Sequence, residues 1–209
     1  MTDETNNNDT PSQPARFEQY RSNVGLERWI QRLRNKEFLR QFGGFLLILF
    51  YTWMAEPEAQ WVPLAIVAVS VGAAIRAWAA GTVFKNEILA TTGPYSIVRH
   101  PLYVGNILIF IGFNLLINEA WAWLVTVSFL WFFYPPAINY EDGKLEGLFG
   151  QQWRDWRNRT PALIPARVQW GALRSEWSIG LFAGRNGELV IFLFTMVCLA
   201  LAIRLGLPF

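Results

Sequence analysis

The sequence predicts an all-α, polytopic integral membrane protein with about five transmembrane helices and additional amphipathic interfacial helices. Of its 209 residues, 53% are hydrophobic, which is above the usual fraction in soluble domains. The apolar residues gather in blocks close to the roughly 20 residues that a helix needs to cross a bilayer. Lys and Arg residues are concentrated in alternate connections between these blocks, as in membrane proteins with a fixed orientation.

The composition also argues against several kinds of site. The single cysteine, Cys198, cannot form an intrachain disulfide, and one Cys with one His gives no zinc-binding spacing. We therefore expect no metal. The formal net charge of +2, without a long run of Lys or Arg, argues against a nucleic-acid partner. The lipid bilayer is the predicted surrounding of the chain.

The N-terminal region divides into two predicted segments. Residues 1–25 are expected to form a disordered tail, because their first half is rich in Asn, Thr and Asp and has almost no apolar side chains. Residues 26–41 are expected to form an amphipathic interfacial helix. Its apolar residues recur at helical spacing, namely Leu26, Trp29, Ile30 and Leu33. The pattern suits a helix in the headgroup layer and equally a helix packed on the loops.

Five apolar blocks follow, at residues 42–55, 61–80, 102–117, 120–138 and 189–207. The second, fourth and fifth are long enough to span a bilayer, whereas the first and third need their flanking residues. The third and fourth are separated only by Asn118 and Glu119, so we expect them to form a tight antiparallel hairpin. The blocks predict a membrane core over residues 42–188 and a C-terminal transmembrane helix over residues 189–209.

The positive charges predict the orientation of the chain. In a five-span arrangement, all but Arg204 of the 18 Lys and Arg residues lie on the same side of the membrane. By the positive-inside rule, the N-terminus and the two long polar loops face the cytoplasm. We expect the protein in the cell membrane, with both loops in the compartment that holds soluble cofactors.

The first polar loop contains the stretch TTGPYSIVRHPLYVGN, at residues 91–106, which carries the only histidine. Gly93 and Pro94 predict a turn, and Pro101 can occupy the first turn of a helix, where its missing N–H costs nothing. Arg99 and His100 then stand at a helix N-terminus, which can bind an anion or a carboxylate. Alternatively, the basic and aromatic residues only anchor a transmembrane helix at the interface.

The second polar loop follows Pro135 and Pro136 at the end of the fourth block. Glu141 and Asp142 are expected to emerge there at the cytoplasmic interface. The residues that follow place apolar side chains at helical spacing, as in an amphipathic helix that returns to the membrane surface. The two carboxylates can equally be the solvated start of that helix.

Taken together, GPYSIVRHPLYVGN and EDGKLEGLFGQQWRDW resemble the isoprenylcysteine carboxyl methyltransferase family and its phospholipid methyltransferase relatives, which are integral membrane enzymes that use S-adenosyl-L-methionine. Arg76 and Trp78 match the helix end that precedes the first motif in this family. The resemblance covers about residues 76–165. It implies methyl transfer to a lipophilic acceptor, either an isoprenylcysteine-type carboxylate or a lipid headgroup, at the cytoplasmic membrane face.

The resemblance also implies a cofactor pocket roofed by the two cytoplasmic segments. It assigns no catalytic residue. The positions that match cofactor-contacting positions of the family are Glu87, Ile88, Leu89, Ala90, Tyr95, His100, Pro101, Leu102, Tyr103 and Glu141. These residue types suit the ligand, because carboxylates can accept from its ammonium and ribose hydroxyls and aromatic faces can lie against its sulfonium.

Departures from the family pattern bear on the acceptor. Family members that methylate prenylcysteine carry an arginine four residues before the first Glu, where this chain has Ala137. Asp142 replaces the second Glu of the family pair, and Trp153 and Trp156 replace two tyrosines. An amine acceptor would have to lose a proton to Asp142, Tyr140 or water.

Two other functions compete with methyl transfer. A membrane reductase of the sterol type, which uses NADPH, has a similar C-terminal region, although this chain has no GxGxxG fingerprint. A non-enzymatic scaffold or transporter is favoured by the glycines of the apolar blocks, which allow close helix packing. It is disfavoured because Arg76 and Arg204 lie near helix ends, so no charged residues line a pathway through the membrane.

Overall fold

A computed structural model describes residues 37–166 and 170–206. The predicted disordered tail at residues 1–25 and most of the predicted interfacial helix at residues 26–41 lie outside the described residues. Residues 37–41 of that predicted helix belong instead to α3, which continues without a break into the first apolar block.

The described part of the chain is helical and contains no strand, which confirms the predicted all-α class. The six longer helices are α3 (Glu37–Trp53), α4 (Val62–Thr82), α5 (Pro101–Ile117), α6 (Ala120–Phe149), α7 (Gln151–Arg157) and α8 (Glu188–Gly206). Three short helical turns lie in the connections, namely η1 (Gly93–Ser96), η2 (Trp170–Ala172) and η3 (Gly180–Arg185).

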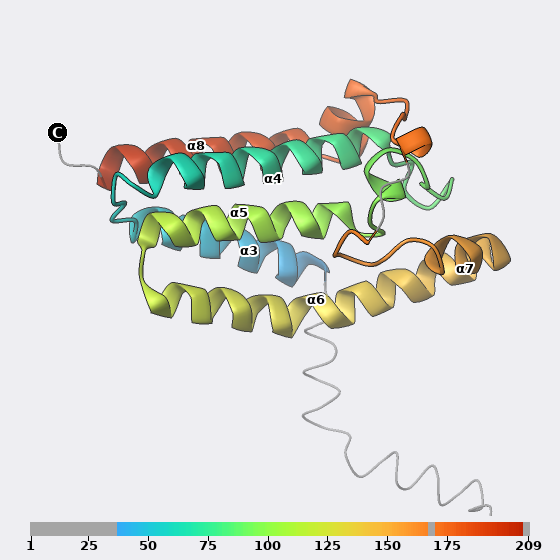
Figure 1. The fold of residues 1–209 in the computed structure, drawn as a ribbon, viewed down its shortest axis with the longest axis horizontal. Coiled ribbons are helices and arrows are strands. Elements are labelled where there is room, and N and C mark those ends of the chain that lie inside the picture. Colours follow the sequence, from blue (N-terminus) through green and yellow to red (C-terminus); the bar gives the residue numbers. More distant parts are fainter. Residues whose placement is uncertain (1–36, 167–169, 207–209) are drawn as a thin grey trace, which may run out of the picture.

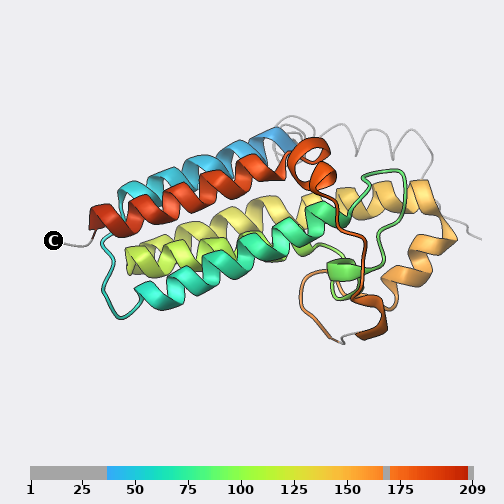
Figure 2. The ribbon, with the colours of Figure 1, turned by 90° about the horizontal axis from the view of Figure 1, so that it is seen from above.

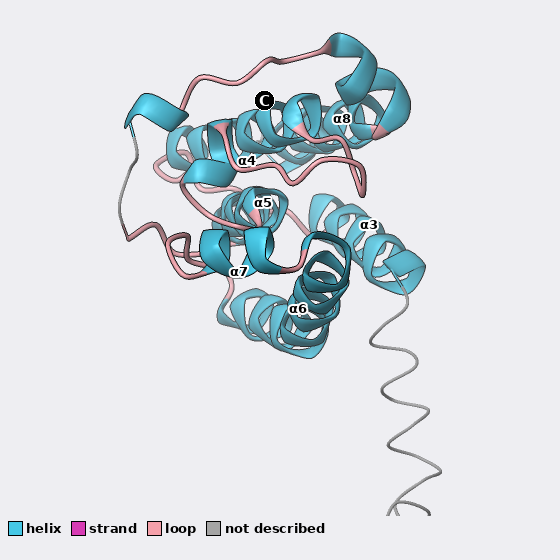
Figure 3. Cartoon of the chain, turned by 90° about the vertical axis from the view of Figure 1, so that its right-hand side faces the viewer, coloured by secondary structure: helices cyan, strands magenta, loops and turns pink. Residues whose placement is uncertain are grey.

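Five helices form a bundle with α5 between α4 and α6 (Figures 1 and 3). Helices α3, α5 and α8 run in one direction, and α4 and α6 run in the other (Figure 1). The connections at one end of the bundle are short. The longer loops, together with α7 and the short turns, gather at the opposite end (Figures 1 and 2). The N-termini of α3, α5 and α8 therefore all point towards the loop end.

Three of the five bundle helices are long and apolar enough to cross a membrane by length and composition: α4, α6 and α8. Helix α5 is apolar but shorter, with 17 residues. Helix α3 also has 17 residues, and its first turns carry Glu37 and Arg40. The expected set of five helices is therefore present in the fold, and three of them meet the length of a full span.

Close contact between α4 and α5 depends on glycines. A Cβ atom on Gly72 would lie 2.6 Å from the carbonyl oxygen of Gly105, and one on Gly112 would lie 2.5 Å from Cγ2 of Val69. Both distances are shorter than any normal carbon contact. These small residues let the two backbones approach, as in other membrane helix pairs.

The core at the far end of the bundle is closed and tightly packed. Tyr51, Phe113 and Leu116 are fully buried there. The Tyr51 hydroxyl donates to the carbonyl of Ala122 at 2.8 Å, and the amide of Asn114 donates to Thr126 Oγ1 at 2.8 Å. These hydrogen bonds link α3, α5 and α6 at a distance from the loop end.

The turn between α5 and α6 has the predicted hairpin form. Asn118 ends α5 in the left-handed conformation, with φ +56°, and its backbone N–H donates to the carbonyl of Asn114. Asn tolerates this conformation better than most residues. Glu119 then leads directly into α6.

The end of α6 differs from the prediction. We expected the fourth block to end near Ile138 and a separate amphipathic helix to follow, but α6 continues through Pro135 and Pro136 to Phe149. The two prolines remove two backbone donors, which alone would weaken the helix. Contacts made by the following turns with the loops offset this cost. The helix ends where Gly150 adopts φ +54°, and α7 begins at the next residue.

Candidate active site

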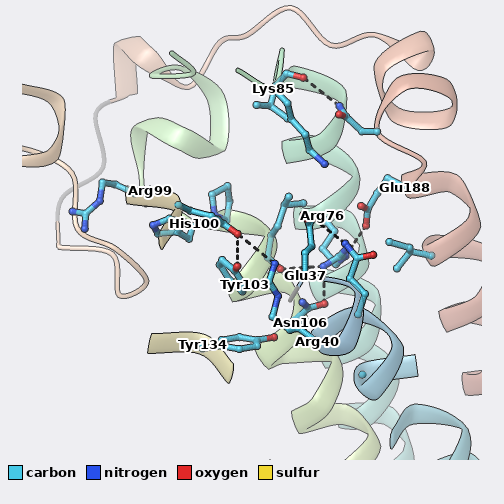
Figure 4. Close-up of a pocket in the computed structure, with 18 of the residues that line it drawn as sticks. Glu37, Arg40, Arg76, Lys85, Arg99, His100, Tyr103, Asn106, Tyr134 and Glu188 are labelled. Atoms are coloured by element: carbon cyan, nitrogen blue, oxygen red, sulfur yellow. Dashed lines mark hydrogen bonds and ion pairs between the residues drawn. The ribbon is translucent and has the colours of Figure 1, made fainter. Parts of the chain in front are cut away.

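A cavity of about 350 Å³ opens at the loop end of the bundle. Its volume falls in the usual range for small-molecule sites. Its walls come from α3, α4, α5, α6, α7 and α8 and from the loop at residues 83–90. His100, Tyr103, Arg40 and Arg76 reach it from different elements and converge on one space (Figure 4).

The backbone around His100 is fixed on both sides. Pro101 occupies the first turn of α5, so His100 is the residue at its N-cap. The backbone N–H of Arg99 donates to the carbonyl of Pro161 at 2.8 Å, and that of His100 donates to the carbonyl of Ala162 at 3.0 Å. The segment after α7 therefore holds the start of α5 in place.

The imidazole of His100 lies between two carboxylates of α6. Its Nε2 is 3.0 Å from Oδ1 of Asp142, and its Nδ1 is 3.4 Å from Oε2 of Glu141. A neutral imidazole has only one N–H, so only the imidazolium can donate to both carboxylates. The side chain is only 4% exposed. Burial alone lowers the pKa of His100, but the hydrogen bonds and charges of Asp142 and Glu141 outweigh it, so the pKa is raised above its ordinary value.

This raised pKa predicts a pH-dependent stability. The stabilisation from His100 is fully present below its unfolded pKa of about 6.5 and is lost as the pH rises through the higher folded pKa. The melting temperature of the purified protein should therefore exceed that of His100→Gln most at about pH 6, and the gap should shrink towards about pH 9. A gap that stays constant or widens over this range would show that the imidazolium does not contribute.

Arg99 holds Asp142 from the other side. Its Nη2 donates to Oδ2 of Asp142 at 2.9 Å, and its Nη1 donates to the carbonyl of Thr160 at 2.7 Å. Both carboxylate oxygens of Asp142 are thus used by His100 and Arg99. Asp142 is buried and does not line the cavity. It positions the imidazole and joins α6 to the segment after α7.

Glu141, in contrast, faces the cavity, and its side chain is 38% exposed. Its Oε1 accepts from the Tyr103 hydroxyl at 2.5 Å and from Nη2 of Arg40 at 3.3 Å. The Arg40 guanidinium also lies over the Tyr103 ring, 5.2 Å from its centre. Glu141 is therefore a carboxylate held by α3 and α5 with part of its surface open to a ligand.

Arg76 forms a second polar centre in the wall of the cavity. Its Nε donates to Oε1 of Glu188 at 2.6 Å, and its Nη1 donates to Oδ1 of Asn106 at 2.6 Å. The carbonyl of Leu102 accepts a further bond at 3.3 Å. One buried guanidinium thus ties α4 to α5 and to the first turn of α8 (Figure 4).

The loop at residues 83–90 covers one side of the cavity. Its start is fixed because the amide of Asn186 donates to the carbonyls of Ala80 and Val83, at the end of α4. Glu87 points away from the cavity and forms an ion pair with Arg185 on the surface. The Arg185 hydrogen bond lowers the pKa of Glu87, so this carboxylate remains ionised.

Aromatic residues close the site on the side of α7. Tyr95, Trp153 and Trp156 are buried together and pack with Leu89. Tyr95 and Trp156 line the cavity. The indole N–H groups of Trp153 and Trp156 have no hydrogen-bond partner among the described residues. Trp156 therefore supplies aromatic surface to this wall, and Trp153 is buried in the same cluster.

Most predicted site residues come together as expected. Nine of them line the cavity, namely Ile88, Leu89, Ala90, Tyr95, His100, Pro101, Leu102, Tyr103 and Glu141. Glu87 does not line it. The two polar segments that resemble the methyltransferase motifs therefore meet, and binding of a cofactor by these residues remains a prediction. Within the described ranges, no group of three His, Cys, Asp or Glu side chains is placed to hold a metal ion.

The sequence did not reveal four other residues as part of this site: Arg40, Asn106, Tyr134 and Glu188. Arg40 and Glu188 come from helices that lie far from the two motifs in the sequence. The sequence did carry one signal for these two residues: Arg40 and Glu188 are charged and lie within two positions of an apolar block. Such residues at the ends of membrane helices can face the protein interior as readily as the headgroups.

The chain is similar in sequence to several known proteins. The family model described as phospholipid methyltransferase matches residues 39–152. The cobalt-zinc-cadmium resistance protein CzcN of Cupriavidus metallidurans is 33% identical over 118 residues, which cover 56% of this chain and 54% of that protein. The protein-S-isoprenylcysteine O-methyltransferase of Schizosaccharomyces pombe is 33% identical over 81 residues, which cover 39% of this chain and 34% of that protein.

A third relative is the nickel-cobalt-cadmium resistance protein NccN of Alcaligenes xylosoxydans xylosoxydans, 30% identical over 127 residues, or 57% of this chain and 59% of that protein. The chain thus spans between about a third and three fifths of these relatives. No solved structure matches the chain significantly. The family match extends over more than half of the sequence and includes His100, Tyr103 and Glu141, and the chain therefore belongs to the phospholipid methyltransferase family.

Proposed function

We propose that this protein transfers a methyl group from S-adenosyl-L-methionine to a lipophilic acceptor at the cytoplasmic face of a membrane. One observation carries the proposal. The carboxylate of Glu141 and the imidazole of His100 meet at the mouth of a cavity that continues between apolar helices. A polar cofactor and a lipophilic acceptor can reach such a site from opposite sides.

The residues of the site fit the cofactor. Glu141 is partly exposed to the cavity and can accept a hydrogen bond from an ammonium or from ribose hydroxyls. Lys85 and Lys144 line the cavity and can bind a carboxylate. Tyr95 and Trp156 provide aromatic surface for a nucleoside base or a cation. When bound, S-adenosyl-L-methionine supplies an electrophilic methyl group.

The surroundings of the cavity favour an acceptor that needs no general base. An amine acceptor has to lose a proton, and Asp142 and Tyr140 were the side chains that the sequence offered for this role. Asp142 is occupied by His100 and Arg99, and Tyr140 points away from the cavity. A carboxylate is already a nucleophile at neutral pH. Its reaction requires alignment and exclusion of water more than proton transfer.

Arg40 is placed to bind the anionic group of such an acceptor. Ala137, at the position of the family arginine, is buried against Tyr103 and Tyr134 and carries no charge. Arg40 of α3 brings a guanidinium to the ring of Tyr103. Among the described residues, Glu141 is the only hydrogen-bond partner of Arg40. Its remaining N–H groups are therefore available to a carboxylate or a phosphate.

This role predicts a separation between acceptor and cofactor effects. Arg40→Gln should raise the KM for a prenylcysteine-type carboxylate about tenfold or more, because one charge-assisted hydrogen bond is lost. The Kd for S-adenosyl-L-methionine should change much less. Arg40→Lys should raise this KM less than Arg40→Gln does, since lysine keeps the charge without the planar fork. An equal loss of both affinities would mean that Arg40 acts on the cofactor side.

The methyl transfer itself is tested with labelled cofactor. The purified protein is incubated with methyl-labelled S-adenosyl-L-methionine and a total membrane lipid extract, N-acetyl-S-farnesylcysteine or N-acetyl-S-decylcysteine. We expect label in an organic-soluble product. Label in none of the three preparations, from a protein that still binds the cofactor, would contradict transfer to a lipophilic acceptor. Stabilisation by NADPH instead of S-adenosyl-L-methionine would favour the reductase alternative.

A further inference from the structure

The cavity has an apolar arm that leaves the polar site and runs into the bundle. Along α3, the cavity is lined by Glu37, Arg40, Gln41, Gly44, Phe45 and Ile48, and three of these, Arg40, Gly44 and Ile48, are spaced four apart. This spacing places them on one face of the helix. The arm therefore starts at the guanidinium of Arg40 and continues past Gly44, which has no side chain.

Other helices supply the remaining walls of the arm. Helix α5 contributes Ile109 and Phe110, α6 contributes Phe129, and α8 contributes Phe194. Apart from Thr195 at its far end, the lining beyond Gly44 is aliphatic or aromatic. A surface of this kind binds a hydrocarbon chain and offers a headgroup no partner.

Three helices give similar lengths for the arm. Helices α3, α5 and α8 all run inward from the polar site (Figure 1). At 1.5 Å per residue, the distance from Arg40 to Ile48 is about 12 Å, and the distances from Tyr103 to Phe110 and from Glu188 to Thr195 are each about 10 Å.

The arm is closed at its inner end. One turn beyond its last lining residues, Tyr51, Phe113 and Cys198 belong to the packed core and are at most 2% exposed. A chain of a membrane phospholipid spans one leaflet, about 15 Å of hydrocarbon. Such a chain is longer than the arm.

We propose that this arm holds the hydrocarbon chain of the methyl acceptor and limits its length, so that the acceptor is a single-chain amphiphile whose chain is shorter than a membrane leaflet. The proposal rests on the function proposed above, because the chain is taken to belong to the molecule whose headgroup lies beside Arg40. Gly44 keeps the arm open, and Ile48 marks its end.

The structure suggests two substitutions with opposite effects. A Cβ atom on Gly44 would lie 3.9 Å from Cζ of Phe129 and 4.0 Å from Cζ of Phe110. These are ordinary contact distances, so Gly44→Ala is tolerated and Gly44→Leu fills the arm one turn below Arg40. Ile48→Ala removes side-chain atoms at the inner end and lengthens the arm. Leu49→Ala is the matched control, because Leu49 is 47% exposed on the outer surface of the same helix.

The probes are N-acetylcysteines with straight S-alkyl chains, from S-hexyl to S-octadecyl in two-carbon steps. Two readouts are measured on the full chain in detergent: the rise in melting temperature without cofactor, and kcat/KM for methyl transfer. For the wild type, both should pass through a maximum near S-octyl or S-decyl. Gly44→Leu should lower kcat/KM for S-decyl about tenfold or more and move the maximum to shorter chains. Ile48→Ala should move it to longer chains, and Leu49→Ala should leave it unchanged.

A response that rises steadily to S-octadecyl, or a maximum that none of the arm substitutions moves, would overturn the proposal. So would the absence of binding by every member of the series. The two readouts separate this proposal from the proposed function. Binding with a length maximum but without methyl transfer supports the arm and contradicts the methyltransferase activity. Methyl transfer without a length maximum supports the methyltransferase activity and contradicts the role of the arm.

Discussion

Glu141→Gln is expected to lower the affinity of the purified protein for S-adenosyl-L-methionine about a hundredfold or more. The substitution keeps the shape of the side chain and removes the charge that the site presents to a ligand ammonium. Loss of one partner from a hydrogen-bonded charge pair that becomes buried when the ligand binds costs about 2–5 kcal/mol of binding free energy. Isothermal titration in detergent measures the effect.

The same helix offers a matched control. Glu146 lies five residues further along α6 and pairs with Arg154 on the surface, where its side chain is 40% exposed. Glu146→Gln should leave the affinity within about twofold, because Glu146 does not line the cavity. Equal affinities of Glu141→Gln and the wild type would remove Glu141 from the cofactor site.

Arg76→Met is expected to lower the free energy of unfolding by about 3–5 kcal/mol, because it leaves the carboxylate of Glu188 buried without its partner. Glu188 is 5% exposed and Arg76 is 10% exposed. The bond from Arg76 to Asn106 is lost as well. Unfolding by denaturant in mixed micelles, followed by tryptophan fluorescence, measures the change.

Two further variants isolate the cause. Arg76→Met combined with Glu188→Gln should recover part of the stability, because no unpaired charge remains. Arg154→Met breaks the exposed pair with Glu146 and should cost less than about 1 kcal/mol. If Arg76→Met is no more harmful than Arg154→Met, the polar centre in the cavity wall does not hold α4, α5 and α8 together.

Much of the bundle was predictable because it follows from composition and length. The apolar blocks fixed the bundle helices to within a few residues at most boundaries, and Pro101 marked the start of α5. The turn at Asn118 also followed from two polar residues between two apolar runs. These features depend on local sequence, which is why they could be read without the structure.

The extension of α6 was not predictable from local rules. Two consecutive prolines normally end a helix, yet α6 continues because its later turns contact other elements. Asp142 binds Arg99, and Leu145 and Phe149 pack on the aromatic residues of the loop end. Tertiary contacts therefore override the local preference, and they place Glu141 inside a helix instead of at its start.

The site was predictable only in part, because the resemblance covers two segments while the cavity has walls from six helices. It correctly brought together His100 and Glu141. It could not show Arg40 or Glu188, which reach the site through the packing of α3 and α8. Glu87 lies next to three lining residues, but an ion pair with Arg185 turns it outward.

The central claim is that the two polar segments bind one cofactor between them. Ultraviolet cross-linking of labelled S-adenosyl-L-methionine to the purified protein, followed by peptide mapping, tests it most directly. We predict label in peptides from residues 83–103 and from residues 141–156, with loss of both when unlabelled cofactor competes. Label confined to other parts of the chain, or label that unlabelled cofactor does not displace, would contradict the account.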